Sequence, residues 1–399
     1  MLRIIIMLTM AVFSVQANVI DFYKEALHNL QYKKSLDLYQ KANKASQNAI
    51  TYSKYVNVNV DLLYSKTYSK SLTTTLNSFD MKDITLRDTI DLFGKNNYKI
   101  QVLRLDMHAK KNTLNVKKEQ VFLSLVNMIG LYNKSVLQVN LQKGFFHKQQ
   151  MILKKLDILV KNGDVTSLEI LRFKNSLTTL QASIVLNEQE IEKMKKQLHV
   201  FAPAKTIPDL VQNKIMFTEK DFLAHNPSAK INMYDTKKLL ATSKGLYDTY
   251  LPTVELSVDY QKLNDPTSYG DNHTFSATIH IPLNGGNFKE AEALKVAALS
   301  KKTEGTEYKI QRKNEYIGYF QAYQSAKKEL DVLQKAYKDY ENSEKIITRA
   351  YLKQYVDFNT YLQVLQQALG VKMAMINMQI QKKVHAEIIN GIASGNIYE

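Results

Sequence analysis

The stretch "GDVTSLEIL", Gly163 to Leu171, separates two long polar–apolar patterns that both predict helix. A second stretch, "VDFNTYLQVL", Val356 to Leu365, occupies a similar place much later in the chain, but it contains no glycine. The segment "LEIL" of the first aligns with "LQVL" of the second at an offset of roughly 200 residues, which indicates an internal duplication. The sequence therefore predicts two helical hairpins, one in each half of the chain.

The first 17 residues, "MLRIIIMLTMAVFSVQA", have the features of a secretory signal peptide. Arg3 supplies a positive charge, an apolar run follows, and small residues precede a cleavage point after Ala17. A transmembrane anchor is the alternative, but the run is shorter than the roughly 20 residues that span a bilayer. Cysteine is absent from the sequence, so a lipid-anchored lipoprotein, disulfides and thiol chemistry are excluded.

The composition favours long, uninterrupted elements. Only 6 prolines and 13 glycines occur in 399 residues, and no Pro/Gly/Ser-rich linker is present. The formal charge is +16, but lysines and glutamates are interleaved. Nucleic-acid binding requires a basic stripe or a recognised module, neither of which occurs, so no nucleic-acid partner is expected.

The first repeat is expected over residues 18–205 and the second over 206–399. Each begins with a helix, continues with two strands and ends with a helical hairpin. Alternation in "YVNVNVDLLY" and in "LPTVELSVDYQ" has the period of two that is typical of strands. The strands are expected at about 55–64 and 97–105, with a long loop between them, and at about 252–262 and 273–283; the hairpin tips are expected near 161–166 and 353–359.

The predicted helices and strands each need partners that one chain does not supply. A helix from Phe288 to Leu352 would be roughly 100 Å long and would need other helices along its apolar stripe. Four strands cannot close a barrel around a pore, and an open sheet would expose its edges. Several copies could close one barrel with apolar residues toward lipid and polar residues toward water. A soluble β-sandwich is the alternative.

Four motifs in this order resemble the TolC family of outer-membrane efflux proteins over the whole chain after residue 17. The first two are an Asn-Pro helix leading through Tyr-Leu-Pro into a strand, and a strand that ends in Pro-Leu and a Gly-Gly turn. The other two are the hairpin tips, of which the first has a Gly followed six positions later by an acid. They read "NPSAKINMYDTKKLLATSKGLYDTYLPTVELSVDYQ", "FSATIHIPLNGGN", "LVKNGDVTSLEILRFKNSL" and "YLQVLQQAL".

The resemblance implies a mainly α fold with a β-barrel part. Three copies would each give four strands to a 12-stranded barrel in the outer membrane of a Gram-negative bacterium, continued by a periplasmic α-helical barrel. It also implies a passive exit duct for tripartite efflux or type I secretion. The implied partners are outer-membrane lipid, a periplasmic adaptor and an inner-membrane pump of the RND or ABC type.

The resemblance places a periplasmic gate at the tips. Glu169 and Arg172 lie one helical turn apart on one face. Gln363 and Gln366 take the equivalent places in the second repeat, where the family often has acids. Rings of such side chains around a pore select ions by charge, so amide rings predict weaker cation selectivity. The alternative is that Glu169 and Arg172 form an exposed intrahelical pair.

The tip loops are also expected to receive the adaptor. The candidates are Gly163, Asp164 and Val165 in the first repeat, and Val356, Asp357 and Phe358 in the second. Gly163 suits a left-handed helix C-cap, and the alignment puts Asp357 at the matching position. Phe358 is expected to lie exposed at the turn, where it could dock a partner; packing into the hairpin is the alternative.

No residue is assigned to catalysis, to a cofactor or to a metal. The eight histidines show no HxxxH or HExxH spacing, and Gly285-Gly286 lacks the rest of a phosphate-binding loop.

Two other classes of protein are alternatives to a channel. A periplasmic adaptor would carry one hairpin between Gly-rich lipoyl-like halves, and a coiled-coil envelope protein would not need paired amphipathic strands in both repeats.

Overall fold

The computed structural model describes residues 18–54, 56–70, 76–161, 166–265, 268–282 and 285–399. These residues form two compact units, each assembled from parts of both repeats. We call them the hairpin unit and the sheet unit. The hairpin unit comprises the described residues of 18–32, 116–226 and 311–399; the sheet unit comprises those of 33–115 and 227–310.

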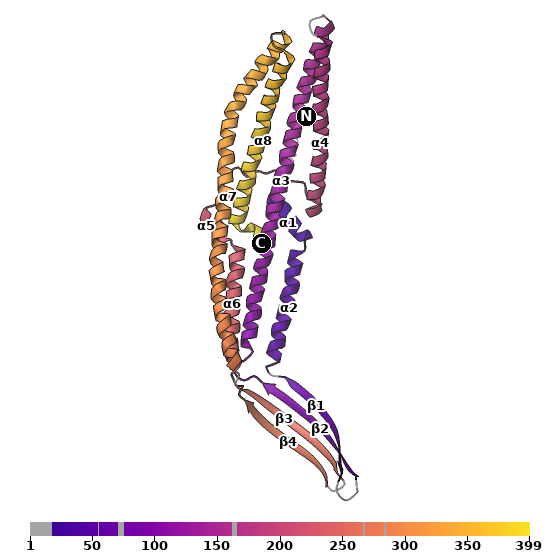
Figure 1. The fold of residues 1–399 in the computed structure, drawn as a ribbon, viewed down its shortest axis with the longest axis vertical. Helices are drawn as coiled ribbons and strands as arrows, with labels where there is room; N and C mark the ends of the chain where they lie inside the picture. Colours follow the sequence, from indigo (N-terminus) through magenta and orange to yellow (C-terminus); the bar gives the residue numbers. More distant parts are fainter. Residues whose placement is uncertain (1–17, 55, 71–75, 162–165, 266–267, 283–284) are drawn as a thin grey trace, which may run out of the picture. The chain divides into compact units, whose positions relative to one another are not determined.

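The order of two helices, two strands, a very long helix and a shorter helix occurs twice along the chain (Figure 1). The longest helices, α3 and α7, contain 65 and 68 residues. A short 3₁₀ helix, η1, follows the second repeat. The elements are α1 (Val19–Asn29), α2 (Tyr32–Tyr52), β1 (Val58–Lys70), β2 (Leu76–Ile90), α3 (Asn97–Lys161), α4 (Ser167–Phe201), α5 (Glu219–Ala224), α6 (Pro227–Asp248), β3 (Thr253–Asp265), β4 (Ser268–His280), α7 (Gly285–Leu352), α8 (Phe358–Ser394) and η1 (Asn396–Tyr398).

None of the helices in the described part of the chain is long and apolar enough to cross a membrane.

The four strands of the sheet unit form one antiparallel sheet in the order β1-β2-β3-β4 (Figure 1). Because side chains alternate along a strand, the register sorts them onto two faces. One face carries apolar rows, for example Val60, Leu86, Val258 and Phe275, and the other carries polar rows. The apolar side chains are not covered by the rest of the chain, since Phe275 is 74% exposed.

The strand predicted at 97–105 is wrong, because these residues form the first turns of α3. The second strand is instead Leu76–Ile90, in the segment predicted to be a loop. Ile84 and Leu86 are flanked on the same face by Lys82 and Asp88, so the apolar alternation there is too short to recognise. The other three predicted strands overlap β1, β3 and β4.

The start of α3 is fixed by close packing against α6. A Cβ added to Gly245 of α6 would lie 1.9 Å from Cγ of Tyr98, so the aromatic ring occupies the place of a side chain. Further along α3 from Tyr98, Asp106 accepts hydrogen bonds from the Tyr39 hydroxyl of α2 and, at 2.7 Å, from Nζ of Lys238 of α6. Burial alone would raise the pKa of Asp106, but these two bonds lower it overall. Three helices of the sheet unit therefore meet on one carboxylate.

The hairpin unit has a large apolar core around the second half of α8. Ile388, Ile389 and Ile392 are almost fully buried, in a stretch from Ala386 to Ala393 in which every residue is buried. The tip of the Phe122 ring of α3 packs against Gly391, where an added Cβ would lie 2.3 Å from Cζ. The single helix expected at the start of the first repeat is divided into α1 and α2, with Gln31 in a left-handed conformation at the break.

Candidate functional site: the hairpin tips

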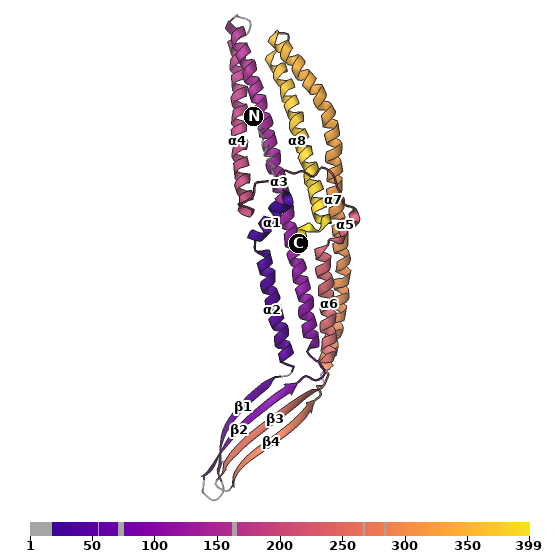
Figure 2. The same ribbon diagram turned by 180° about the vertical axis from the view of Figure 1, so that it is seen from behind.

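The tips of the two hairpins lie within the hairpin unit, where α3 leads to α4 and α7 leads to α8 (Figure 2). In the first hairpin α3 ends at Lys161 and α4 begins at Ser167, and in the second α7 ends at Leu352 and α8 begins at Phe358. Gly163, Asp164 and Val165 lie outside the described residues, so the predicted Gly163 cap and the docking role of these three stay predictions.

Four aromatic rings, which we call the tip cluster, join α4 to α7 and α8. They are Phe173, Tyr351, Phe358 and Tyr361, all of them buried. Tyr351 stacks on Tyr361 with ring centroids 4.4 Å apart, and Phe173 lies 5.7 Å from Phe358. Such ring pairs stabilise beyond the area that they bury. The tip cluster therefore fastens one hairpin to the other near their ends.

A hydrogen bond connects the tip cluster to α3 as well. The Tyr361 hydroxyl donates to Oε1 of Gln149 at 3.2 Å, in a buried position. Burial raises the pKa of Tyr361 to about 12, so the phenol stays protonated. Tyr351 has a buried hydroxyl that meets no hydrogen-bond partner among the described residues. Its pKa is raised by burial first and by the nearby Glu169 carboxylate second.

Glu169 has a local structural role in addition to its predicted place at a gate. Thr166 caps α4, and its hydroxyl accepts a hydrogen bond from the Glu169 backbone N–H at 3.3 Å. An acid in the first turn of a helix is stabilised by the positive helix end. Glu169 is half-buried and Arg172 is exposed, and no ion pair joins these two described side chains. Glu169 and Arg172 therefore do not form the intrahelical ion pair that was considered as the alternative to a gate.

The turn of the second tip differs from the one predicted. Gln354, not Asp357, takes the left-handed conformation, with φ of 63°. The Gln354 N–H donates to the Tyr351 carbonyl and the Tyr355 N–H to the Ala350 carbonyl, each at 2.9 Å, which is the Schellman pattern of a helix end.

Asp357 instead begins the next helix. Its Oδ1 accepts hydrogen bonds from the backbone N–H groups of Asn359, at 2.8 Å, and Thr360, at 3.0 Å, and its Oδ2 accepts one from the Thr360 hydroxyl. These bonds, that of the Thr360 hydroxyl most of all, lower the pKa of Asp357. The alignment with Gly163 led to the wrong assignment because it matched leucines in the following helix and not the turns themselves.

The remaining tip candidates fall into an exposed and a covered group. Gln363 and Gln366 are exposed and lie one turn apart on α8. Val356 is half-buried, whereas Phe358 is only 5% exposed and belongs to the tip cluster. The expectation that Phe358 lies exposed at the turn is therefore wrong, since its ring packs into the hairpins.

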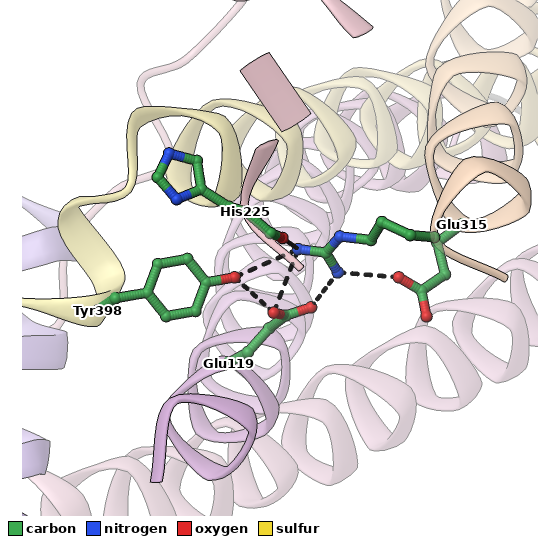
Figure 3. Close-up of polar contacts among 5 residues, drawn as sticks. Glu119, His225, Glu315 and Tyr398 are labelled. Carbon is green, nitrogen blue, oxygen red and sulfur yellow. Dashed lines mark hydrogen bonds and ion pairs between the residues drawn. The ribbon is translucent and has the colours of Figure 1, made fainter. Parts of the chain in front are cut away.

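A second polar cluster, which the sequence analysis did not identify, lies inside the hairpin unit (Figure 3). At its centre is Arg312 of α7, 5% exposed, which forms a two-pronged ion pair with Glu119 of α3. Its guanidinium also donates to Glu315 at 2.9 Å, to the carbonyl of His225 at 2.6 Å and to the hydroxyl of Tyr398 at 3.2 Å. We call these five residues the Arg312 cluster.

The Arg312 cluster binds the segment that follows α8. The Tyr398 hydroxyl donates to Oε2 of Glu119 at 2.5 Å, and its ring stacks on His225. Burial alone would lower the pKa of Arg312, but Glu119 raises it overall, so the guanidinium stays charged. Two charged groups that are 193 residues apart in sequence have no common pattern, and this is why sequence reasoning missed them.

No group of three or more His, Cys, Asp or Glu within the described residues is arranged to hold a metal ion. A groove of about 250 Å³ lies between α3, α7 and α8. Its charged lining is engaged within the chain, because Lys148 pairs with Glu344 at 3.4 Å and Lys372 donates to the Tyr337 hydroxyl at 3.1 Å. Because these charges are already paired within the chain, the groove is a weaker candidate for a binding site than the tips or the sheet.

Glu387 gives the hairpin unit a pH-dependent stability. Its carboxyl is 5% exposed on α8, and burial raises its pKa to about 7. Because the folded pKa lies above the unfolded value, the unfolding free energy should fall as pH rises from about 4.5 to 7. Glu387→Gln removes this cost, and at pH 8 it should stabilise the unit by on the order of 2 to 3 kcal/mol.

Urea unfolding followed by far-ultraviolet circular dichroism at several pH values measures this effect. Glu329→Gln is the matched control, since Glu329 is exposed on α7. Equal pH dependence in wild type and Glu387→Gln would contradict the assignment.

Comparison with solved structures identifies the fold. The outer-membrane channel OprN matches with a TM-score of 0.76 and 13% sequence identity, over 95% of this chain and 90% of OprN. The outer membrane protein VceC of Vibrio cholerae matches with a TM-score of 0.71 and 15% identity, over 94% of this chain and 96% of VceC. The open state of the MtrE outer membrane channel of Neisseria gonorrhoeae matches with a TM-score of 0.70 and 12% identity, over 95% and 89%.

A scan against protein-family models finds no match, and a search of curated protein sequences finds none at a significant level. The chain therefore has the fold of the TolC-type outer-membrane channels, as the motifs predicted, at a sequence identity too low to show more than the fold.

Proposed function

We propose that this protein is the outer-membrane exit duct of a tripartite efflux or type I secretion system. The observation that carries the proposal is the sheet of the sheet unit. Its apolar face is exposed and its opposite face is polar, an arrangement that suits a wall between lipid and water. The fold comparisons support the same reading. The protein would act as a passive conduit and not as an enzyme.

The sheet also supports a homotrimer. Among the described strands, β1 pairs only with β2 and β4 only with β3, so each chain has two free edges. Free edges that flank an apolar face favour pairing with further copies, because closure removes both edges. Three chains would then share one 12-stranded barrel in the outer membrane of a Gram-negative bacterium, with the helices in the periplasm.

Recovery in the outer-membrane fraction and a heat-sensitive trimer band on electrophoresis test this proposal. The purified protein should also form ion-conducting pores in planar bilayers. A monomer that is recovered from the periplasm would exclude a duct and favour a periplasmic adaptor or a coiled-coil envelope protein.

The periplasmic tips would dock an adaptor that connects the duct to an inner-membrane pump of the RND or ABC type. The candidates on the described surface are Asp357, which is exposed, and Val356, which is half-buried. Gly163, Asp164 and Val165 complete the set, whereas Phe358 would act by shaping the tip from inside. Photo-cross-linkers at Asp357 and Asp164 should capture a co-expressed adaptor. Capture only from positions on α2 would place the docking surface elsewhere.

Glu169, Arg172, Gln363 and Gln366 would surround the periplasmic mouth. With amides at two of these positions, cation selectivity should be weak, and Glu169 should supply most of it. We expect Glu169→Gln to move the reversal potential toward zero in planar bilayers under a salt gradient. Since Glu169 also lies in the first turn of α4, Glu188→Gln on the same helix is the control for loss of a carboxylate. An unchanged reversal potential would contradict the gate assignment.

A further inference from the structure

Two lysines lie on the apolar face of the sheet, next to the apolar rows and on the side of those rows away from the helices. Lys82 of β2 and Lys262 of β3 are register partners, and the same face holds the apolar rows. Both side chains are exposed. Like charges directly opposite each other across an antiparallel pair destabilise the sheet, since their Cβ atoms are only about 5 Å apart. A negative group held between the two ammonium groups would remove this repulsion.

The neighbouring residues do not supply that negative group. Lys82 faces Tyr64 on its other side, and Asp271 is the register partner of Lys262 on β4. No ion pair joins Lys262 to Asp271, and none joins Lys82 to any described carboxylate. Asp80 lies two residues from Lys82 on the same face, but none of the ion pairs among the described residues joins its carboxylate to Lys82.

The position of the pair along the strands indicates what the negative group belongs to. One row nearer the helices, on the same face, come Leu62, Ile84, Tyr260 and His273. Tyr260 and His273 lie with ring centroids 5.0 Å apart, beside the exposed apolar rows. Aromatic rings that border an apolar band are typical of the level of lipid headgroups, and lysines just beyond it can reach headgroup phosphates.

We propose that Lys82 and Lys262 together bind the phosphate of a lipid headgroup at the border of the apolar rows. The inference rests on the proposed function, because it needs the apolar rows to face lipid. Each ammonium group has three donors, and two of them on adjacent strands can share one phosphate. The apolar rows beside the pair would then hold the acyl chains of the same lipid.

Native mass spectrometry of the full chain purified in detergent tests the proposal. The probes are phosphatidic acid and phosphatidylcholine with the same acyl chains. Phosphatidic acid should bind preferentially, and Lys82→Gln/Lys262→Gln should weaken its binding about tenfold or more, since each lysine near such a surface contributes a severalfold effect. Phosphatidylcholine binding should not change.

Three further measurements make the result specific. Lys327→Gln/Lys328→Gln removes two exposed charges from α7 and should leave binding unchanged. Lys82→Arg/Lys262→Arg should keep it. Excess inorganic phosphate should not displace phosphatidic acid; if it does, the pair takes a free anion and the lipid assignment is overturned.

The pore-forming activity of the same preparations separates this inference from the proposed function. A wild type that conducts in planar bilayers without preferring phosphatidic acid overturns the lysine site alone. An equal loss in the α7 control does so as well, because it shows only a general charge effect. A wild type that neither conducts nor binds either lipid overturns the proposed function and, with it, the lysine site.

Discussion

Replacing Arg312 by Leu is expected to lower the free energy of unfolding of the hairpin unit by about 3 to 5 kcal/mol, since it leaves the Glu119 carboxylate buried without its cation. The side chain of Glu119 is 12% exposed, so water does not replace the guanidinium. The hydroxyl of Tyr398 loses one of its partners in the same step. The midpoint of urea unfolding, followed by circular dichroism, measures the loss.

The double variant Arg312→Leu/Glu119→Leu separates the charge from the packing. Once both charges are gone, a large part of the stability should return, because an apolar pair can replace a buried ion pair at little cost. Lys143→Leu is the surface control: its ion pair with Glu188 is about half-exposed and should contribute under about 1 kcal/mol. A double variant as unstable as the single one would mean that Arg312 matters for its cation–π contact with the Phe222 ring, and not for its ion pair with Glu119.

Tyr361→Ala is expected to loosen the tips of the hairpins. The ring is fully buried, stacks on Tyr351 and lies 6.4 Å from Phe173, so its removal should cost about 3 to 5 kcal/mol. If the tips form the mouth of a duct, this loss should also raise the single-channel conductance, because the two hairpins are no longer fastened to each other.

Tyr355→Ala is the matched control for the tip. Tyr355 lies in the same turn but is 77% exposed, so both stability and conductance should stay near the wild-type values. Tyr361→Phe tests the hydrogen bond to Gln149 alone and should cost only about 1 kcal/mol. Conductance unchanged in Tyr361→Ala, despite the lost stability, would show that the tip cluster is structural and that the mouth is controlled elsewhere.

The sequence predicted the repeated order of elements because periodicity over long segments is a strong signal. The helices α3, α4, α7 and α8 and the strands β3 and β4 have sustained patterns of this kind. The strand β2 was missed because only Ile84 and Leu86 are apolar between two charged residues on that face. The strand at 97–105 was predicted wrongly for the opposite reason. Its sequence, "NYKIQVLRL", alternates as a strand does, but Tyr98 lies in α3 and packs against Gly245.

The candidate site was predictable in position and less so in detail. Alignment of the two repeats located both tips, but local hydrogen bonds decide which residue turns the chain. In the second tip, Gln354 takes the left-handed conformation and Asp357 is the N-cap of α8. The burial of Phe358 depends on Phe173 of the other hairpin, a contact that no local pattern contains. The Arg312 cluster depends on pairings of distant residues in the same way.

The core of the hairpin unit joins the first and last described helices of the chain. The Tyr23 hydroxyl on α1 donates to the carbonyl of Ile397 at 2.7 Å, across 374 positions in sequence. Contacts of such separation slow folding, since the intervening chain must be ordered before they form. Although the chain is a duplication, neither half holds a complete core. An ancestor with a single repeat would have had to complete its core by pairing with a second copy of itself.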